Sequence, residues 1–212
     1  MVQNNEMTPK RLGRPRAYDP QTALERATDR FWRSGYAGTS LDQLCAETGM
    51  NRPSLYAAFG DKHTLYMKAL AHYWALSHAA MQPLADKALP LRQALMRAYD
   101  AQLSLYFAEG SEARGCFVLG TAITEAVEDP EIRASLSAGF ARLDAALEAR
   151  LHQARETGEL PPEADPAALA VLAAAVLHSI AIRARAGTAR AALREIARRA
   201  VNMICNCPAD SA

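Results

Sequence analysis

The stretch that decides the fold is GTSLDQLCAETGMNRPSLYAAFGDKHTL, residues 38–65. Ser40 is a residue type that caps the start of a helix, and its position predicts a helix that begins directly after it. Gly49 readily adopts the left-handed conformation that ends a helix. Asn51 then caps a second short helix, which ends at Gly60. The stretch therefore predicts two short helices joined by a tight glycine turn.

A longer helix is expected before this pair, over residues 20–34. A long helix followed by two short ones with a tight turn is typical of a helix-turn-helix, in which the second short helix enters the major groove of DNA. The residues expected to pack inward against Phe31 are Leu44, Met50, Leu55 and Phe59. The residues expected on the outer face of the second short helix are Arg52, Ser54 and Tyr56.

The rest of the chain also predicts helices. Asp-Pro pairs at residues 19–20, 129–130 and 165–166 each supply a capping aspartate and a proline for the first helical position. The further helices expected are one from near Lys62, then Leu91–Ala108, Ala113–Val127, Pro130 to Gly158, Pro166–Arg185 and Ala189–Ile204, with a loop over Pro83–Pro90. No alternating strand pattern occurs, so the sequence predicts an all-α fold of nine helices.

Composition excludes several classes of protein. Half of the 212 residues are hydrophobic and 22% are charged, which is typical of a folded globular chain. The start of the chain lacks the apolar core of a signal peptide, and the four cysteines then indicate free thiols in the cytoplasm. The apolar run over residues 167–177 is too short to span a bilayer, so no membrane contact is expected.

At residues 38–65 the sequence resembles the TetR family of transcriptional regulators. The similarity extends over residues 23–70 and follows the family pattern of a Gly-Thr/Ser turn, a short helix ending in Gly-Val, and a Leu-Tyr-x-x-Phe recognition segment before a lysine. Cys45 replaces a usual alanine and His63 a usual acidic residue. The resemblance implies a nine-helix architecture with an N-terminal DNA-binding domain and a C-terminal domain for ligand binding and dimerisation.

The resemblance also implies a set of DNA contacts. The residues expected at phosphates are Thr39, Ser40, Tyr56 and Lys62, and those expected at base edges are Asn51, Arg52, Pro53 and Ser54. The chemistry agrees, because arginine can bond guanine bidentately while hydroxyls and lysine bind the backbone. Two alternatives stay open: Tyr56 as an aromatic that only packs, and Ser40 as a plain helix cap.

A basic arm is expected over residues 1–18, before the helix-turn-helix domain of residues 19–65. It carries Lys-Arg-Leu-Gly-Arg-Pro-Arg at residues 10–16, and its Gly-Arg-Pro core resembles peptides that insert arginines into a narrow minor groove. Arg14 and Arg16 are the arginines predicted to insert. The alternative is a solvated tail that only raises non-specific affinity.

The resemblance assigns residues 66–212 to ligand binding and dimerisation. The candidates for a small hydrophobic ligand, which ordinary core packing also explains, are Trp74, Tyr99, Leu103, Phe107, Cys116, Phe117, Thr121, Phe140 and His178. The two C-terminal helices are predicted to form a homodimer, because the helix over residues 166–185 is apolar on most of its circumference. Its alternative role is as the central helix of the monomer.

Cys116 follows Arg114-Gly115 and resembles a cysteine through which some family members sense electrophiles or oxidants. A thiol in the first turn of a helix beside Arg114 would have its thiolate favoured. The alternatives are a thiol sensor and a small buried residue.

These observations predict a regulator, by family default a repressor, that binds a palindromic operator as a dimer and is released by a small molecule. Phosphate loops, nucleophile elbows and metal-ligand spacings do not occur in the sequence, so no enzyme activity, cofactor or metal is expected. A helical adaptor that binds protein is the other alternative, against which the basic arm and the recognition segment argue.

Overall fold

The computed structural model describes residues 19–107 and 113–206, and all regular structure within these ranges is helical. Within these ranges the nine predicted α-helices are confirmed. The two arginines predicted to enter the minor groove, Arg14 and Arg16, lie outside the described residues. The elements are α1 (Pro20–Ser34), α2 (Leu41–Thr48), α3 (Arg52–Phe59), α4 (Lys62–Ala80), the 3₁₀ turn η1 (Gln82–Ala85), α5 (Leu91–Tyr106), the π-helical turn η2 (Val118–Ala122), α6 (Ile123–Glu125), α7 (Pro130–Glu156), α8 (Pro166–Arg185) and α9 (Arg190–Cys205).

The three Asp-Pro pairs begin helices as predicted. The carboxylates of Asp19, Asp129 and Asp165 each accept hydrogen bonds from two backbone amides in the first turn of α1, α7 and α8. These amides have no partner within the helix, so each cap stabilises its helix by about 0.5–2 kcal/mol.

Two predicted segments differ in the structure. The expected loop over residues 83–90 contains the short turn η1. The helix expected from Ala113 does not begin until Phe117, because residues 113–116 run as irregular backbone. Gly115 has φ +63°, and a Cβ there would lie 2.6 Å from the Ala181 carbonyl oxygen of α8. Close packing against α8 therefore displaces the start of the helix.

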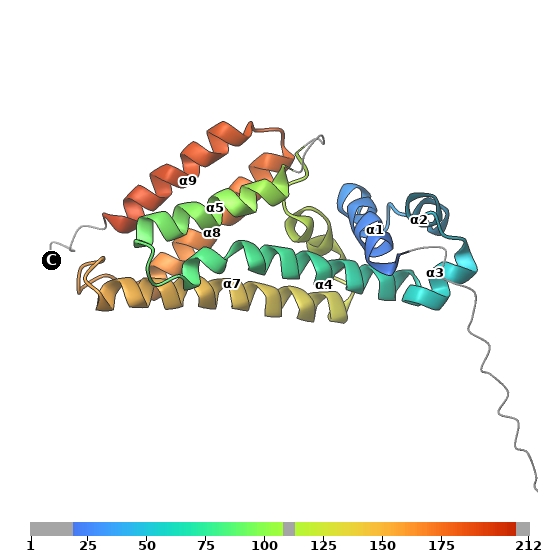
Figure 1. Cartoon of the computed structure of the whole chain (residues 1–212), viewed down its shortest axis with the longest axis horizontal. Helices are drawn as coiled ribbons and strands as arrows, with labels where there is room; N and C mark the ends of the chain where they lie inside the picture. Colours follow the sequence, from blue (N-terminus) through green and yellow to red (C-terminus); the bar gives the residue numbers. More distant parts are fainter. Residues whose placement is uncertain (1–18, 108–112, 207–212) are drawn as a thin grey trace, which may run out of the picture.

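Helix α4 connects the two ends of the molecule (Figure 1). Helix α1 packs against α4, α2 and α3 lie at the same end of the molecule, and α7 runs alongside the second half of α4. The predicted domain boundary after residue 65 falls inside α4, so one continuous helix joins the helix-turn-helix to the C-terminal helices.

Helix α8 is long and apolar enough to cross a membrane by length and composition alone. In the structure it packs against α7, α9 and α5. Nine of its residues, including Leu177 and Ile180, are buried in the monomer. The helix is therefore a central core helix, and it still leaves Val171 and Ile182 exposed.

Gly139 of α7 makes room for the indole of Trp74 on α4. A Cβ at this position would lie 2.2 Å from Cε2 and Cζ2 of Trp74. The ring also stacks on His78 at a centroid distance of 5.4 Å and meets Phe140 edge-on at 5.6 Å. Only a residue without a side chain permits this approach of α7 to α4.

We expect Gly139→Ala to destabilise the chain. Alanine is favoured over glycine inside a helix by about 0.8–1 kcal/mol, but overpacking against Trp74 costs more. With an overpacking cost of about 1–3 kcal/mol set against this gain, the free energy of unfolding in urea should fall by up to about 2 kcal/mol. Ser137→Ala, on the exposed side of α7, is the control and should change stability little. A higher urea midpoint for Gly139→Ala would contradict the close packing.

Candidate nucleic-acid interface

The turn between α2 and α3 is fixed by local hydrogen bonds. Ser40 and Gln43 form a capping box, in which the Gln43 amide donates to Ser40 Oγ at 3.2 Å and the Ser40 amide donates to Gln43 Oε1 at 2.9 Å. Gly49 ends α2 with φ +69°, in the left-handed region. The Asn51 side chain then accepts from the Ser54 amide at 2.9 Å and caps α3. The local sequence thus sets the geometry of the turn.

The packing side of the helix-turn-helix is confirmed. The buried residues against Phe31 are Leu44, Met50, Leu55 and Phe59, each no more than 5% exposed. On the outer face of α3, Arg52 and Pro53 are exposed, Tyr56 is 45% exposed and Ser54 is half-buried. The alternative that Tyr56 only packs is not supported, because nearly half of its surface is free.

Arg52 is paired with a residue that sequence reasoning missed. Its Nε and Nη2 donate to Asp42 Oδ1 at 3.1 and 2.7 Å. Both side chains are largely exposed, so the pair contributes little to stability. It does hold the guanidinium against α2, and it leaves Nη1 without a bond to Asp42. The spacing of ten residues between two helices gives no local signal for this pair.

Thr39 does not offer its hydroxyl to phosphate. The residue is 1% exposed, and its Oγ1 donates to the Gly35 carbonyl at 2.7 Å. The structure therefore corrects the expectation for this side chain, because the hydroxyl closes the turn after α1. Ser40, the next residue, is exposed.

Lys62 lies at the junction between α4 and the C-terminal helices. Its Nζ is 4.2 Å from the centroid of the Tyr36 ring, an arrangement of cation over aromatic face. Burial lowers the pKa of Lys62, and the nearby Glu125 carboxylate opposes this shift. Beside it, His63 Nε2 lies 2.7 Å from Asp129 Oδ2 at the start of α7. His63 thus links the first turn of α4 to the start of α7.

Comparison with known proteins agrees with this geometry. The family model described as "Bacterial regulatory proteins, tetR family" matches residues 23–68, and the one described as "Tetracyclin repressor-like, C-terminal domain" matches residues 90–201. The chain belongs to the TetR family. The predicted resemblance is confirmed, and this TetR-family chain is a DNA-binding transcriptional regulator and not an enzyme.

Individual relatives cover most of the regulator. The chain is 30% identical to the HTH-type transcriptional repressor ComR of Escherichia coli over 191 residues. This alignment covers 89% of this chain and 90% of ComR. The chain is 29% identical over 152 residues to the uncharacterized regulator YezE of Bacillus subtilis, which covers 72% and 78%. A cysteine-substituted form of the TetR-family regulator CifR, solved with operator DNA of 26 base pairs, has a TM-score of 0.76 at 33% identity and covers 90% of this chain and 98% of CifR.

The predicted ligand residues of this TetR-family regulator lie in separate parts of the C-terminal core. Trp74, Phe140 and His178 do come together from α4, α7 and α8, with Phe140 5.3 Å from the His178 ring. Among the described residues, Trp74 Nε1 and His178 Nε2 are buried without a hydrogen-bond partner. Burial lowers the pKa of His178, so the ring is favoured in its neutral form.

The other predicted ligand residues pack in different places. Tyr99 and Leu103 are buried on α5, where the Tyr99 hydroxyl donates to the Ala173 carbonyl at 2.9 Å. Thr121 is buried and donates to the Phe117 carbonyl at 2.8 Å. Phe107 is half-buried at the end of α5. These side chains therefore serve core packing in the structure.

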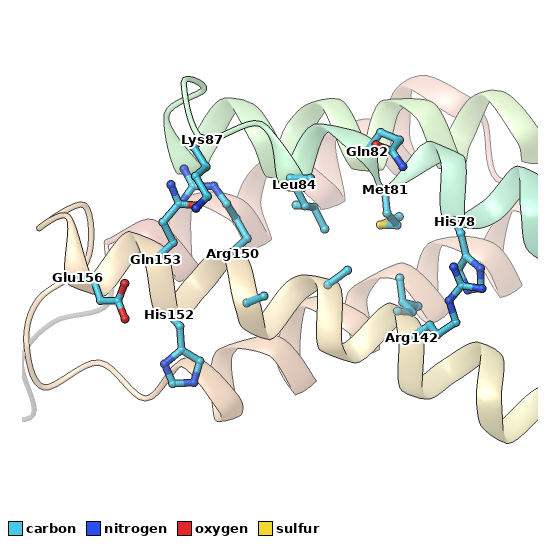
Figure 2. Close-up of a pocket in the computed structure, with 14 residues that line it drawn as sticks. His78, Met81, Gln82, Leu84, Lys87, Arg142, Arg150, His152, Gln153 and Glu156 are labelled. Carbon is cyan, nitrogen blue, oxygen red and sulfur yellow. The ribbon is translucent and has the colours of Figure 1, made fainter.

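A groove of about 570 Å³ lies elsewhere, between the end of α4, η1 and the second half of α7 (Figure 2). None of the nine predicted ligand residues lines it. Its polar lining includes His78, Arg142, Arg150 and Lys87. Sequence reasoning missed these residues because charged side chains at helical spacing are typical of a solvated face.

Cys116 is a buried thiol. The residue is 8% exposed, and the Tyr73 hydroxyl donates to its Sγ at 2.9 Å. Burial raises the pKa of Cys116, and the Tyr73 hydrogen bond offsets only part of the effect. Of the two alternatives for Cys116, the structure agrees with the small buried residue, because Cys116 precedes the helix instead of opening it and burial disfavours its thiolate.

We expect Cys116 to alkylate slowly in the folded chain at neutral pH. The thiolate is the reacting species, and a raised pKa keeps its population low until the pH is alkaline. Mass-spectrometric rates of iodoacetamide labelling at Cys116 should be much lower in the native chain than in denaturant and should rise steeply with pH. Equal native and denatured rates at neutral pH would contradict the burial.

Proposed function

We propose that this TetR-family regulator is a cytoplasmic repressor that binds a palindromic operator as a homodimer and is released by a small molecule. The observation that carries the proposal is the outer face of α3, where Arg52 and Tyr56 are exposed above a buried, locally capped helix-turn-helix. ComR is a transcriptional repressor and CifR was solved with operator DNA, and both relatives support the same interpretation.

In this proposal residues 19–65 read the operator. Arg52 contacts a base edge together with Asn51, Pro53 and Ser54, while Ser40, Tyr56 and Lys62 bind phosphates. Arg52 has to turn from Asp42 toward the base. Because both side chains are largely exposed, breaking their ion pair costs little free energy. Arg14 and Arg16 of the basic arm add minor-groove contacts.

The homodimer in this proposal forms through α8 and α9. Val171, Leu172 and Ile182 of α8 are 69%, 43% and 59% exposed, and they lie along one stripe with Ala175. Met203 adds a 69% exposed side chain on α9. Pairing with a second copy would remove this apolar surface from water, and it would set the two α3 helices about one turn of DNA apart.

Ligand release in this proposal acts through α4. The small hydrophobic ligand lies near Trp74, Phe140 and His178, where two buried ring nitrogens, Trp74 Nε1 and His178 Nε2, lack partners and could bind its polar atoms. Trp74 and Lys62 lie on the same continuous helix, so a shift of α4 at the ligand moves the recognition helices. A differential affinity of a few kcal/mol between the two states is sufficient.

The DNA-binding part of the proposal is tested with three variants. We expect Arg52→Ala to lose about 1–3 kcal/mol per half-site on operator DNA and to relax the preference at one base position, because a bidentate base contact is lost. Lys62→Ala should weaken binding to all duplexes alike, and it should make the dependence of the binding constant on salt concentration shallower by about one ion per subunit. Tyr56→Phe removes only a hydroxyl, so it should reduce the favourable free energy of operator binding by less than Arg52→Ala does.

The measurement is a titration of operator and scrambled duplexes at several salt concentrations, with Arg155→Ala on α7, away from α3, as the control. If all three variants bound the operator like the unsubstituted chain, α3 would not be the recognition helix.

A charge on the exposed stripe of α8 should give a monomer. We expect this of Val171→Glu, since the carboxylate would be buried against the second copy. Val127→Glu is the matched control, because Val127 is 74% exposed and lies between α6 and α7. Sedimentation equilibrium reports the mass. A monomeric parent chain at micromolar concentration would refute the dimer.

A further inference from the structure

The groove between η1 and α7 has polar ends and an apolar middle. In Figure 2 the ends of Lys87, Arg150 and Gln153 converge at one end of the groove, and His78 and Arg142 lie together at the other. Between them the lining is mostly apolar, with Gln82 beside Met81, and its apolar members are Met81, Leu84, Leu143, Ala146 and Ala149. The volume of about 570 Å³ is in the range of sites for small organic molecules.

The charge of the groove is mainly positive. Its lining holds three permanently charged cations, Lys87, Arg142 and Arg150, against one acidic residue, Glu156. A cleft lined by one sign of charge raises the local concentration of ions of the opposite sign. The groove therefore favours an anion.

Arg150 is the unusual member of this lining. Its side chain is fully buried, and its Nη2 donates to the Leu89 carbonyl and to Glu159 Oε1, each at 2.8 Å. Among the described residues, its Nε and Nη1 are buried without any hydrogen-bond partner. Leaving a buried charged donor without a hydrogen bond costs free energy, so a bound acceptor at these atoms would be favourable. A carboxylate oxygen fits as an acceptor for Nη1, because hydrogen bonds between a guanidinium and a carboxylate are charge-assisted and strong.

We propose that this groove is a second ligand site, which binds a small organic monoanion with its carboxylate at Arg150 and Lys87 and its apolar body on Met81, Leu84 and Leu143. Glu159 pairs with Arg150 and Glu156 lines the groove, so these two carboxylates leave one net positive charge among Lys87, Arg142 and Arg150. A monoanion therefore matches better than a doubly charged phosphate ester.

The site is distinct from the core cluster of Trp74, Phe140 and His178, although His78 connects them. His78 lines the groove and stacks on the Trp74 indole with an interplanar angle of 16°. Occupancy of the groove can thus alter the packing of α4. Any effect on operator binding rests on the proposed function, whereas anion binding itself does not.

Calorimetric titration of the DNA-free chain with octanoate and with 1-octanol tests the site. The two probes share an alkyl chain and differ in charge. We expect saturable binding of octanoate at one site per chain, at least about tenfold tighter than 1-octanol. Octanoate that binds no tighter than 1-octanol would overturn the proposal.

Variants locate the binding. Arg150→Met should abolish the preference for octanoate, and the exposed Lys87→Met should reduce it several-fold even if Arg150→Met fails to fold. Arg155→Met is the matched control, since Arg155 is on the same helix, does not line the groove and donates to the Ala164 carbonyl. If Lys87→Met and every folded variant kept the full preference, octanoate would bind elsewhere and the groove would not be the site.

Loss of operator binding on adding octanoate is measured separately. Binding without release would leave the groove as a ligand site and would count only against its coupling to DNA. Failure of the parent chain to bind operator DNA would count against the proposed function and not against the groove.

Discussion

The structure depends on the aromatic contacts around Phe117. This buried ring lies 5.9 Å from Trp32 of α1 and 5.7 and 5.6 Å from Tyr66 and Tyr73 of α4. Rings at these distances and angles are favoured by their quadrupoles and exclude water. Phe31 extends the cluster into the helix-turn-helix through its contact with Tyr66 at 5.0 Å. The DNA-binding helices therefore share a core with the C-terminal helices.

Polar contacts surround this cluster and join it to the predicted dimer helix. Arg185 of α8 donates from Nη1 to the carbonyls of Trp32 and Arg114 at 3.4 and 3.1 Å. Its guanidinium fits only because Gly120 lacks a side chain, since a Cβ there would lie 2.4 Å from Nη1. The Trp32 indole in turn donates to the Gly115 carbonyl at 3.0 Å. These contacts therefore join α8 directly to α1.

The helix-turn-helix was predictable because its signals are local. Ser40, Gly49 and Asn51 specify caps and a left-handed turn within a few residues, and the structure has each of them. The Asp-Pro helix starts and the bounds of α8 followed from the same rules. Such signals can be recognised in a single sequence because the unpaired backbone amides at a helix start bond to a side chain that is close in the sequence.

The sequence by itself therefore determined the all-helical class, the exposed face of α3 and the family. Tertiary structure decided the rest, namely which side chains meet across helices. Arg52 forms an ion pair with Asp42, and the Thr39 hydroxyl donates to the Gly35 carbonyl. The thiol of Cys116 is buried, and burial raises its pKa. The groove at Arg150 also belongs to this group. These outcomes depend on the packing of segments distant in the chain, and burial sets the protonation and exposure of a group through neighbours that no local pattern encodes.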